Sequence, residues 1–190
     1  RVSVKGDGSF TQKLERGQSY VMLANCRGYL NCKQELTTDS INESKNYELE
    51  FPLASITRPV LIDNIFYEFD KATLTAESTK ALNDLIKMLN DNPNITIELN
   101  AHCDYFGNDS YNEALSQRRA EAVVKFLVAG GIDINRLTAK GYGESQPKVI
   151  NKRIAKKYQF LKEGDVLTED FILKLPAEQQ EICNAINRRT

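Results

Sequence analysis

The sequence ITIELNAHCDYFGNDSYNEALSQRRAEAVVKFLVA, residues 95–129, predicts a strand, a polar loop and a helix. Apolar and polar residues alternate from Ile95 to His102, which is the period of a strand with one apolar face. After the loop, apolar residues recur at helical spacing and define a stripe that should face the core. They are Leu115, Ala122, Val123 and Phe126. The residue one helical turn after Leu115 is Arg119, so a charge lies in the middle of this apolar stripe.

A buried arginine is costly unless a carboxylate or an anionic ligand meets it. Asp104 follows the strand directly, and we expect it to lie close to Arg119. Spacing alone favours a structural salt bridge between the strand end and the helix. The other interpretation is a binding site in which both charges meet a ligand.

Several short motifs, taken in their order along the chain, resemble the signature of the OmpA-like domain, the module that binds peptidoglycan in the bacterial cell envelope. The motifs are His102-Cys103-Asp104, Asn112, Leu115-Ser116, Arg119-Ala120, Gly141-Tyr142-Gly143-Glu144, Pro147 and Asn187-Arg188-Arg189. The resemblance implies an α+β fold, the OmpA-like mixed α/β sandwich with the order β-α-β-α-β, over residues 59–190. In the family a last strand follows the N-R-R motif, and since this chain stops at Thr190 we expect that strand to be absent or truncated.

The resemblance also implies a ligand, the diaminopimelate of a peptidoglycan stem peptide. In this interpretation Asp104 takes the ammonium and Arg119 forks onto the carboxylate. The residues assigned to the ligand in this way are Asp104, Arg119, Asn112, Arg188, Asp70 and Cys103. The family has threonine where Cys103 stands, so we expect the pocket rim to lose a hydrogen bond.

The remaining elements of this domain are predicted from the spacing of apolar residues and from residues that begin or end helices. A strand is expected at residues 61–69, and a helix after it, with Thr75 as its N-cap and Asn92-Pro93 at its end. The helix that carries Arg119 should end at the glycine pair of residues 130–131. The segment between residues 148 and 187 is longer than the insertion usual in the family. We expect three helices in it, and its run of basic residues is typical of a solvent-exposed helix face.

Residues 1–58 show short apolar runs with turn signals and no helical period, which predicts a small partial β-sandwich. The run from Tyr20 to Ala24 is expected to be a buried central strand, and residues 47–53 alternate as another strand. The pieces DGSF, LERGQSY and ANCRGYL resemble the carboxypeptidase-regulatory-like sandwich, a non-catalytic module, and imply a spacer. The junction is placed at residues 54–59, where a proline interrupts the pattern.

Composition narrows the class of protein. The chain has 190 residues, 41% of them hydrophobic, and a formal charge of −1, which is typical of one or two globular domains and argues against a nucleic-acid partner. No apolar run is long enough for a membrane-spanning helix, and the chain begins at Arg1, so membrane attachment is expected only through other parts of a longer protein. Four cysteines are too few for a disulfide scaffold; Cys26 and Cys32 either form a local disulfide or stay free.

An enzyme is the weakest interpretation. His102 is the only histidine, and it points to the opposite strand face from Cys103, so the two do not form a nucleophile and base. A zinc site would need His102, Asp104 and the distant Cys183, without the short ligand spacing of metal sites. We therefore expect no catalytic residue, metal or cofactor.

The sequence thus predicts a non-catalytic anchor that binds peptidoglycan in the periplasm, attached to the outer membrane of a Gram-negative envelope. The first alternative is an interaction or structural module in which Asp104 and Arg119 form a structural salt bridge. The second is a metal-dependent cell-wall hydrolase. The sequence makes no prediction about an oligomer.

Overall fold

The computed structural model describes residues 1–38, 43–56, 62, 65, 67 and 72–190. It divides into two compact units, Arg1–Arg58 and Pro59–Thr190. Part of the junction expected at residues 54–59, and most of the strand expected at residues 61–69, lie outside the described residues.

In the first unit two strands, β1 (Ser19–Ala24) and β2 (Cys32–Thr37), form an antiparallel pair. Val21 and Leu23 of β1 are more than half exposed, so the prediction of a buried central strand is wrong. The physical reason is that, within the described part of the unit, β1 pairs with β2 alone and no second layer covers its outer face. Residues 47–53 are described and are not a strand, and the β-sandwich remains a prediction. Cys26 and Cys32 are both free thiols.

The second unit is a mixed α/β fold, as predicted. Its first part contains α1 (Ser78–Asp91), β3 (Ile97–Ala101), α2 (Asp109–Ala129) and β4 (Leu137–Gly141), with a short 3-10 turn at Ile134–Arg136. Strands β3 and β4 are parallel, in a register that runs from Ile97 opposite Leu137 to Ala101 opposite Gly141. Parallel neighbours need a crossover connection, which α2 provides. Outside these strands, Tyr67 forms an isolated bridge with Leu74.

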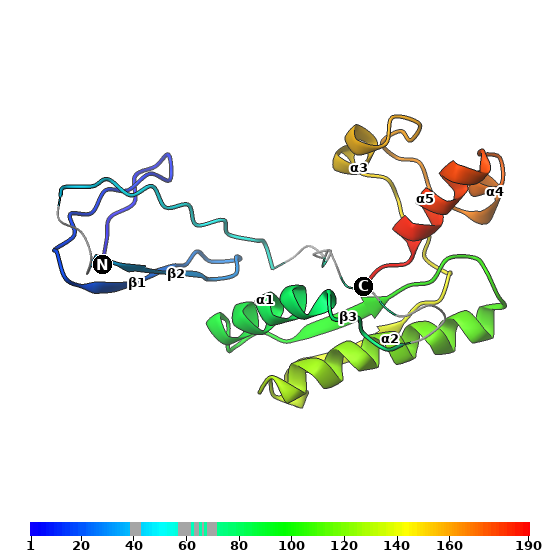
Figure 1. Ribbon diagram of the computed structural model, residues 1–190, viewed down its shortest axis with the longest axis horizontal. Coiled ribbons are helices and arrows are strands. Elements are labelled where there is room, and N and C mark those ends of the chain that lie inside the picture. The colour runs from blue at the N-terminus through cyan, green and yellow to red at the C-terminus, as the bar shows by residue number, and fades with distance from the viewer. Residues whose placement is uncertain (39–42, 57–61, 63–64, 66, 68–71) are drawn as a thin grey trace. The chain divides into compact units, whose positions relative to one another are not determined.

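The main core lies between the two helices and one face of this sheet (Figure 1). Its buried apolar residues are Ile65, Leu82, Leu85, Leu89, Leu99, Val123, Val124, Leu127, Ile132 and Leu137. The buried stripe of α2 is rotated slightly from the predicted one, since Val123 and Leu127 are buried where Phe126 is only half-buried. Arg119 lies on the buried face of α2, as predicted.

The ends of these helices follow the expected signals with one exception. Asn92 closes α1 and Gly130 closes α2, and Gly131 adopts a left-handed backbone with φ 91°. The N-cap is the exception, because α1 begins at Ser78 with Glu77 before it and no side-chain cap, so the assignment of Thr75 is wrong. The Thr75 hydroxyl instead lies 3.3 Å from the hydroxyl of Ser78.

The insertion forms a small helical lobe with a core of its own. Its helices are α3 (Lys152–Lys157), α4 (Glu169–Ile172) and α5 (Ala177–Asn187), and they lie together, apart from α1 and α2 (Figure 1). The core consists of Ile150, Leu161, Leu167, Ile172 and Cys183. After α5 the chain returns to the sheet, where the backbone N–H of His102 donates to the carbonyl of Arg189 at 2.9 Å.

The backbones of α2 and β4 approach each other closely at Gly141. A Cβ atom on Gly141 would lie 2.2 Å from the backbone nitrogen of Gln117 and 2.6 Å from its Cα. We therefore expect Gly141→Ala to lower the free energy of unfolding of the second unit by roughly 3 kcal/mol, since backbone atoms cannot move aside as a flexible side chain can. Urea denaturation followed by the helical circular dichroism signal measures this change.

The matched control is Gly6→Ala, because an added Cβ at Gly6 meets nothing within 4 Å. We expect that variant to unfold like the parent chain. Equal midpoints for the two variants would show that the contact at Gly141 is not as close as described.

Candidate functional site

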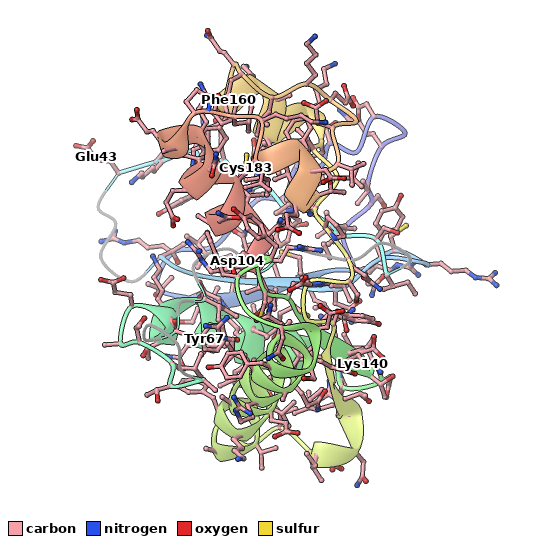
Figure 2. The ribbon with its side chains drawn as sticks, turned by 90° about the vertical axis from the view of Figure 1, so that its right-hand side faces the viewer. Glu43, Tyr67, Asp104, Lys140, Phe160 and Cys183 are labelled. Atoms are coloured by element: carbon pink, nitrogen blue, oxygen red, sulfur yellow. The ribbon has the colours of Figure 1, made fainter. Side chains whose placement is uncertain are left out.

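Asp104 follows β3 and forms an ion pair with a residue far along the chain. Its side chain is only 10% exposed, and its Oδ2 lies 2.5 Å from a terminal guanidinium nitrogen of Arg188. The other oxygen, Oδ1, accepts a hydrogen bond of 3.3 Å from the backbone N–H of Phe106. Arg188 is the C-cap of α5, so the helical lobe contributes the cation that meets Asp104. In Figure 2, Asp104 lies between the lobe that carries Cys183 and the layer that carries Tyr67.

Arg119 lies close by but on different partners. Arg119 is 8% exposed, and its guanidinium carbon lies 5.0 Å from the ring centroid of Tyr67, which is a cation–π contact. One guanidinium nitrogen lies 3.8 Å from the sulfur of Cys103. The Tyr67 hydroxyl is 2.9 Å from the Thr190 hydroxyl and donates to the carbonyl of Arg119 at 3.3 Å.

The direct salt bridge between Asp104 and Arg119, weighed from the sequence, is not formed among the described residues. Among those residues Asp104 forms its ion pair with Arg188. The reason is geometric, since Arg188 approaches Asp104 from α5 while Arg119 is held against the Tyr67 ring and the Cys103 sulfur. Both charges are close to Cys103, since Arg119 contacts its sulfur and Asp104 is the next residue along the chain.

Cys103 contacts the backbone of α2 and the guanidinium of Arg119. Its thiol donates to the carbonyl of Asn112 at 3.5 Å and accepts from Arg119 at 3.8 Å. The expected loss of a hydrogen bond relative to threonine stays a prediction, and contacts to sulfur are weaker than those to oxygen. Burial raises the pKa of the Cys103 thiol, and the positive charge of Arg119 opposes this shift, so the group is a neutral thiol at neutral pH.

Asn112 is buried and holds the loop that follows Asp104. Its amide nitrogen donates to the carbonyls of Phe106 at 3.0 Å and Asp104 at 3.3 Å, and to the Glu144 carboxylate at 2.5 Å. Gly107 in this loop has a φ of 110°, and an added Cβ would lie 3.3 Å from the Asn112 side-chain oxygen. The loop therefore has a fixed shape in front of α2. Asp70, the remaining residue assigned from the resemblance, lies outside the described residues.

His102 faces away from Cys103 and stacks on Tyr142, with ring centroids 5.3 Å apart and an interplanar angle of 11°. Its Nδ1 is buried, and no hydrogen-bond partner for it is found among the described residues. Burial, together with the smaller effect of the positive charges of Arg189 and Lys148, lowers the pKa of His102 to about 4. The ring is neutral at pH 7 and offers no cation to a ligand.

Two findings concern other kinds of site. Within the part of the chain that the structure describes, no group of three or more His, Cys, Asp or Glu side chains is placed to hold a metal ion. A search of the same residues finds no helix with the length and apolarity needed to cross a bilayer. Cys183, a ligand in the weighed zinc site, is buried in the core of the helical lobe.

Sequence reasoning missed Glu181 and Tyr67. Glu181 accepts from the second terminal nitrogen of Arg188 at 2.5 Å, seven residues before it on α5. The spacing of two helical turns could have predicted this contact, because it places both side chains on one face of the helix. No local pattern indicated Tyr67, which meets Arg119 across 52 positions of sequence.

Comparison with known proteins places this region in a family. Residues 66–159 match the OmpA family. The photosystem I P700 chlorophyll a apoprotein A2 of Gloeobacter violaceus is 34% identical over 117 residues, which are 60% of this chain and 13% of that protein. Outer membrane protein A of Escherichia fergusonii is 37% identical over 93 residues, which are 48% of this chain and 38% of that protein. The chain thus spans well under half the length of these curated relatives.

Among solved structures, the peptidoglycan-associated lipoprotein from Burkholderia pseudomallei is similar over 46% of this chain and 74% of that chain. The identity is 26% and the TM-score is 0.43.

The low pKa of His102 makes the stability of the second unit depend on pH. Below the ordinary pKa of 6.5 the unfolded chain binds a proton at His102, whereas the folded chain does not until the pH approaches 4. Stability from this group is therefore fully present above pH 6.5 and is lost as the pH falls towards 4. Between pH 7 and pH 4.5 the loss amounts to roughly 2 kcal/mol.

His102→Phe keeps the stack on Tyr142 and removes the titrating group. We expect the difference in unfolding free energy between pH 7 and pH 4.5, measured in urea, to be smaller in the variant by that amount. Since the chain has one histidine, a single imidazole signal in proton NMR reports its titration directly. An imidazole that titrates near pH 6.5 would contradict the described burial.

Proposed function

The chain contains an OmpA family domain at residues 66–159, and on that premise we propose that it binds the peptide stem of peptidoglycan without catalysis. The ligand group is the free end of a diaminopimelate residue, which presents an ammonium and a carboxylate side by side. The site is built around Asp104 and Arg119.

One observation carries the proposal. Asp104, in the loop after β3, and Arg119, on α2, are each less than 10% exposed, and Arg119 contacts the sulfur of Cys103, the residue next to Asp104. A buried carboxylate favours a cation, and a planar guanidinium matches the two oxygens of a carboxylate. A zwitterionic group that enters here meets one charge with each end.

Arg188 is the second cation of the site and the resident partner of Asp104. Once the ligand ammonium has taken its place at Asp104, the nitrogen that leaves Asp104 can meet the ligand carboxylate while the other nitrogen stays with Glu181. Asn112 acts indirectly, by holding the loop that follows Asp104, because its amide nitrogen already bonds to that loop and to Glu144. Asp70 and Cys103 are further proposed contacts.

The affinity of one such site is modest. Each charge-assisted hydrogen bond contributes roughly 1.5–3 kcal/mol, and the ligand and Asp104 must first give up their present partners. Firm attachment comes from many copies on one polymer, since each further contact is then effectively intramolecular. This is the behaviour of an anchor.

An anchor of this kind works in the periplasm, where the wall of a Gram-negative cell faces the outer membrane. The family of outer membrane protein A gives this location its support. Attachment to the membrane belongs to parts of a longer protein.

A second candidate function has an observation in its favour. Because Asp104 already has a cation in Arg188, the charges could serve only to join the helical lobe to the sheet. In that case the module binds another protein or acts as a spacer, and the buried charges are structural.

Calorimetric titration with a diaminopimelate-containing stem peptide separates the two functions. We expect Asp104→Asn and Arg119→Lys each to weaken binding about tenfold or more, because the first removes the charge that meets the ammonium and the second removes the planar fork. Both substitutions nearly preserve side-chain size, and circular dichroism checks the fold.

The controls are Asp84→Asn on the exposed side of α1 and Arg118→Lys, the exposed neighbour of Arg119 on α2. Both should bind like the parent chain. A folded parent chain that binds no stem peptide would refute the anchor and favour the structural module.

A further inference from the structure

A single guanidinium joins two carboxylates at the end of α5. One terminal nitrogen of Arg188 lies 2.5 Å from Asp104 Oδ2, and the other lies 2.5 Å from Glu181 Oε1. A guanidinium usually pairs both of these nitrogens with the two oxygens of one carboxylate, which is the stronger arrangement. Here the fork of Arg188 is divided between two residues.

Because its fork is divided, Arg188 pairs with only one of the two oxygens of Asp104. Only Oδ2 faces Arg188, and within the described residues the contact given to Oδ1 is the 3.3 Å bond from the Phe106 N–H. If Glu181 did not hold the second nitrogen, Arg188 could turn to engage both oxygens of Asp104. Glu181 thus works against full closure of the Asp104 carboxylate.

The three side chains differ in their exposure to water. Asp104 is 10% exposed, Arg188 36% and Glu181 66%. A ligand ammonium that pairs with Oδ2 of Asp104 must move the Arg188 nitrogen from it. A partly buried guanidinium without a carboxylate is unfavourable. Glu181, the most exposed of the three side chains, remains a partner for Arg188 after Arg188 has moved away from Asp104.

We infer that Glu181 is a positioning residue of the stem-peptide site: it holds one edge of the Arg188 guanidinium and so keeps Asp104 accessible to a ligand ammonium. The inference rests on the proposed function and adds a residue of the insertion to it. Glu181 touches no ligand itself. Its effect passes through Arg188, and since Glu181 is mostly exposed, the effect is screened by salt.

The test uses the whole chain and a diaminopimelate-containing stem peptide in calorimetric titrations at low ionic strength. We expect Glu181→Gln to weaken binding about three- to fivefold, with a smaller effect at 0.5 M salt. The matched control is Glu178→Gln, which removes the same charge from an exposed position on the same helix. That variant should bind like the parent chain.

A second background separates positioning from a merely structural role. In Arg188→Lys a point charge replaces the fork and cannot be divided between two carboxylates in the same way, so adding Glu181→Gln should change binding by less than about 1.5-fold. An equal loss in both backgrounds would overturn the inference, and so would a Glu181→Gln variant that binds as tightly as the Glu178→Gln control. A parent chain that does not bind the peptide overturns the proposed function itself, and the inference with it.

Discussion

The close contact between the backbones of α2 and β4 is the constraint on which the rest of the second unit depends. With no side chain at Gly141, the helix lies directly on the strand end, and the Gln117 side chain accepts from the Gly141 N–H at 2.8 Å. One residue earlier on the helix, the Ser116 hydroxyl accepts from the Gly143 N–H at 2.8 Å. A further turn back, Asn112 reaches the Asp104 loop and Glu144. A helix held further from the sheet would lose these bonds together, and the loop would lose its shape.

The same contact explains how charges come to be buried at this end of the sheet. Because α2 is pressed onto β4, the side chain one turn beyond Leu115 has no route to water and must find partners inside. Tyr67 supplies an aromatic face and Cys103 a sulfur, both of them soft partners that suit a delocalised guanidinium. Asp104 pairs with Arg188, which the helical lobe contributes.

Much of this arrangement could be predicted from the sequence because it is local. The strand, loop and helix of residues 95–129 follow from period, and the three helices of the insertion follow from period and caps. Arg119 stood out because a charge interrupted an apolar stripe. The partner of Asp104 could not be predicted in the same way, since Arg188 lies 84 positions away and only packing of the lobe brings it near. The Tyr20–Ala24 run was misjudged for a related reason, because apolar content does not say whether a second layer will cover a strand.

The helical lobe has its own core, yet it is tied to the site by its last helix. The Asn187 side chain accepts from the Lys148 N–H at 2.9 Å and donates to the Leu167 carbonyl at 2.8 Å, which fixes the end of α5 against the start of the insertion. Tyr105, from the Asp104 loop, packs on the core of the same lobe. The position of Arg188 is therefore set by the packing of the insertion together with the hydrogen bond that the His102 N–H donates to the next residue, Arg189. Because Tyr105 belongs to the loop after Asp104, a change in the packing of the lobe would act on both members of the Asp104–Arg188 ion pair at once.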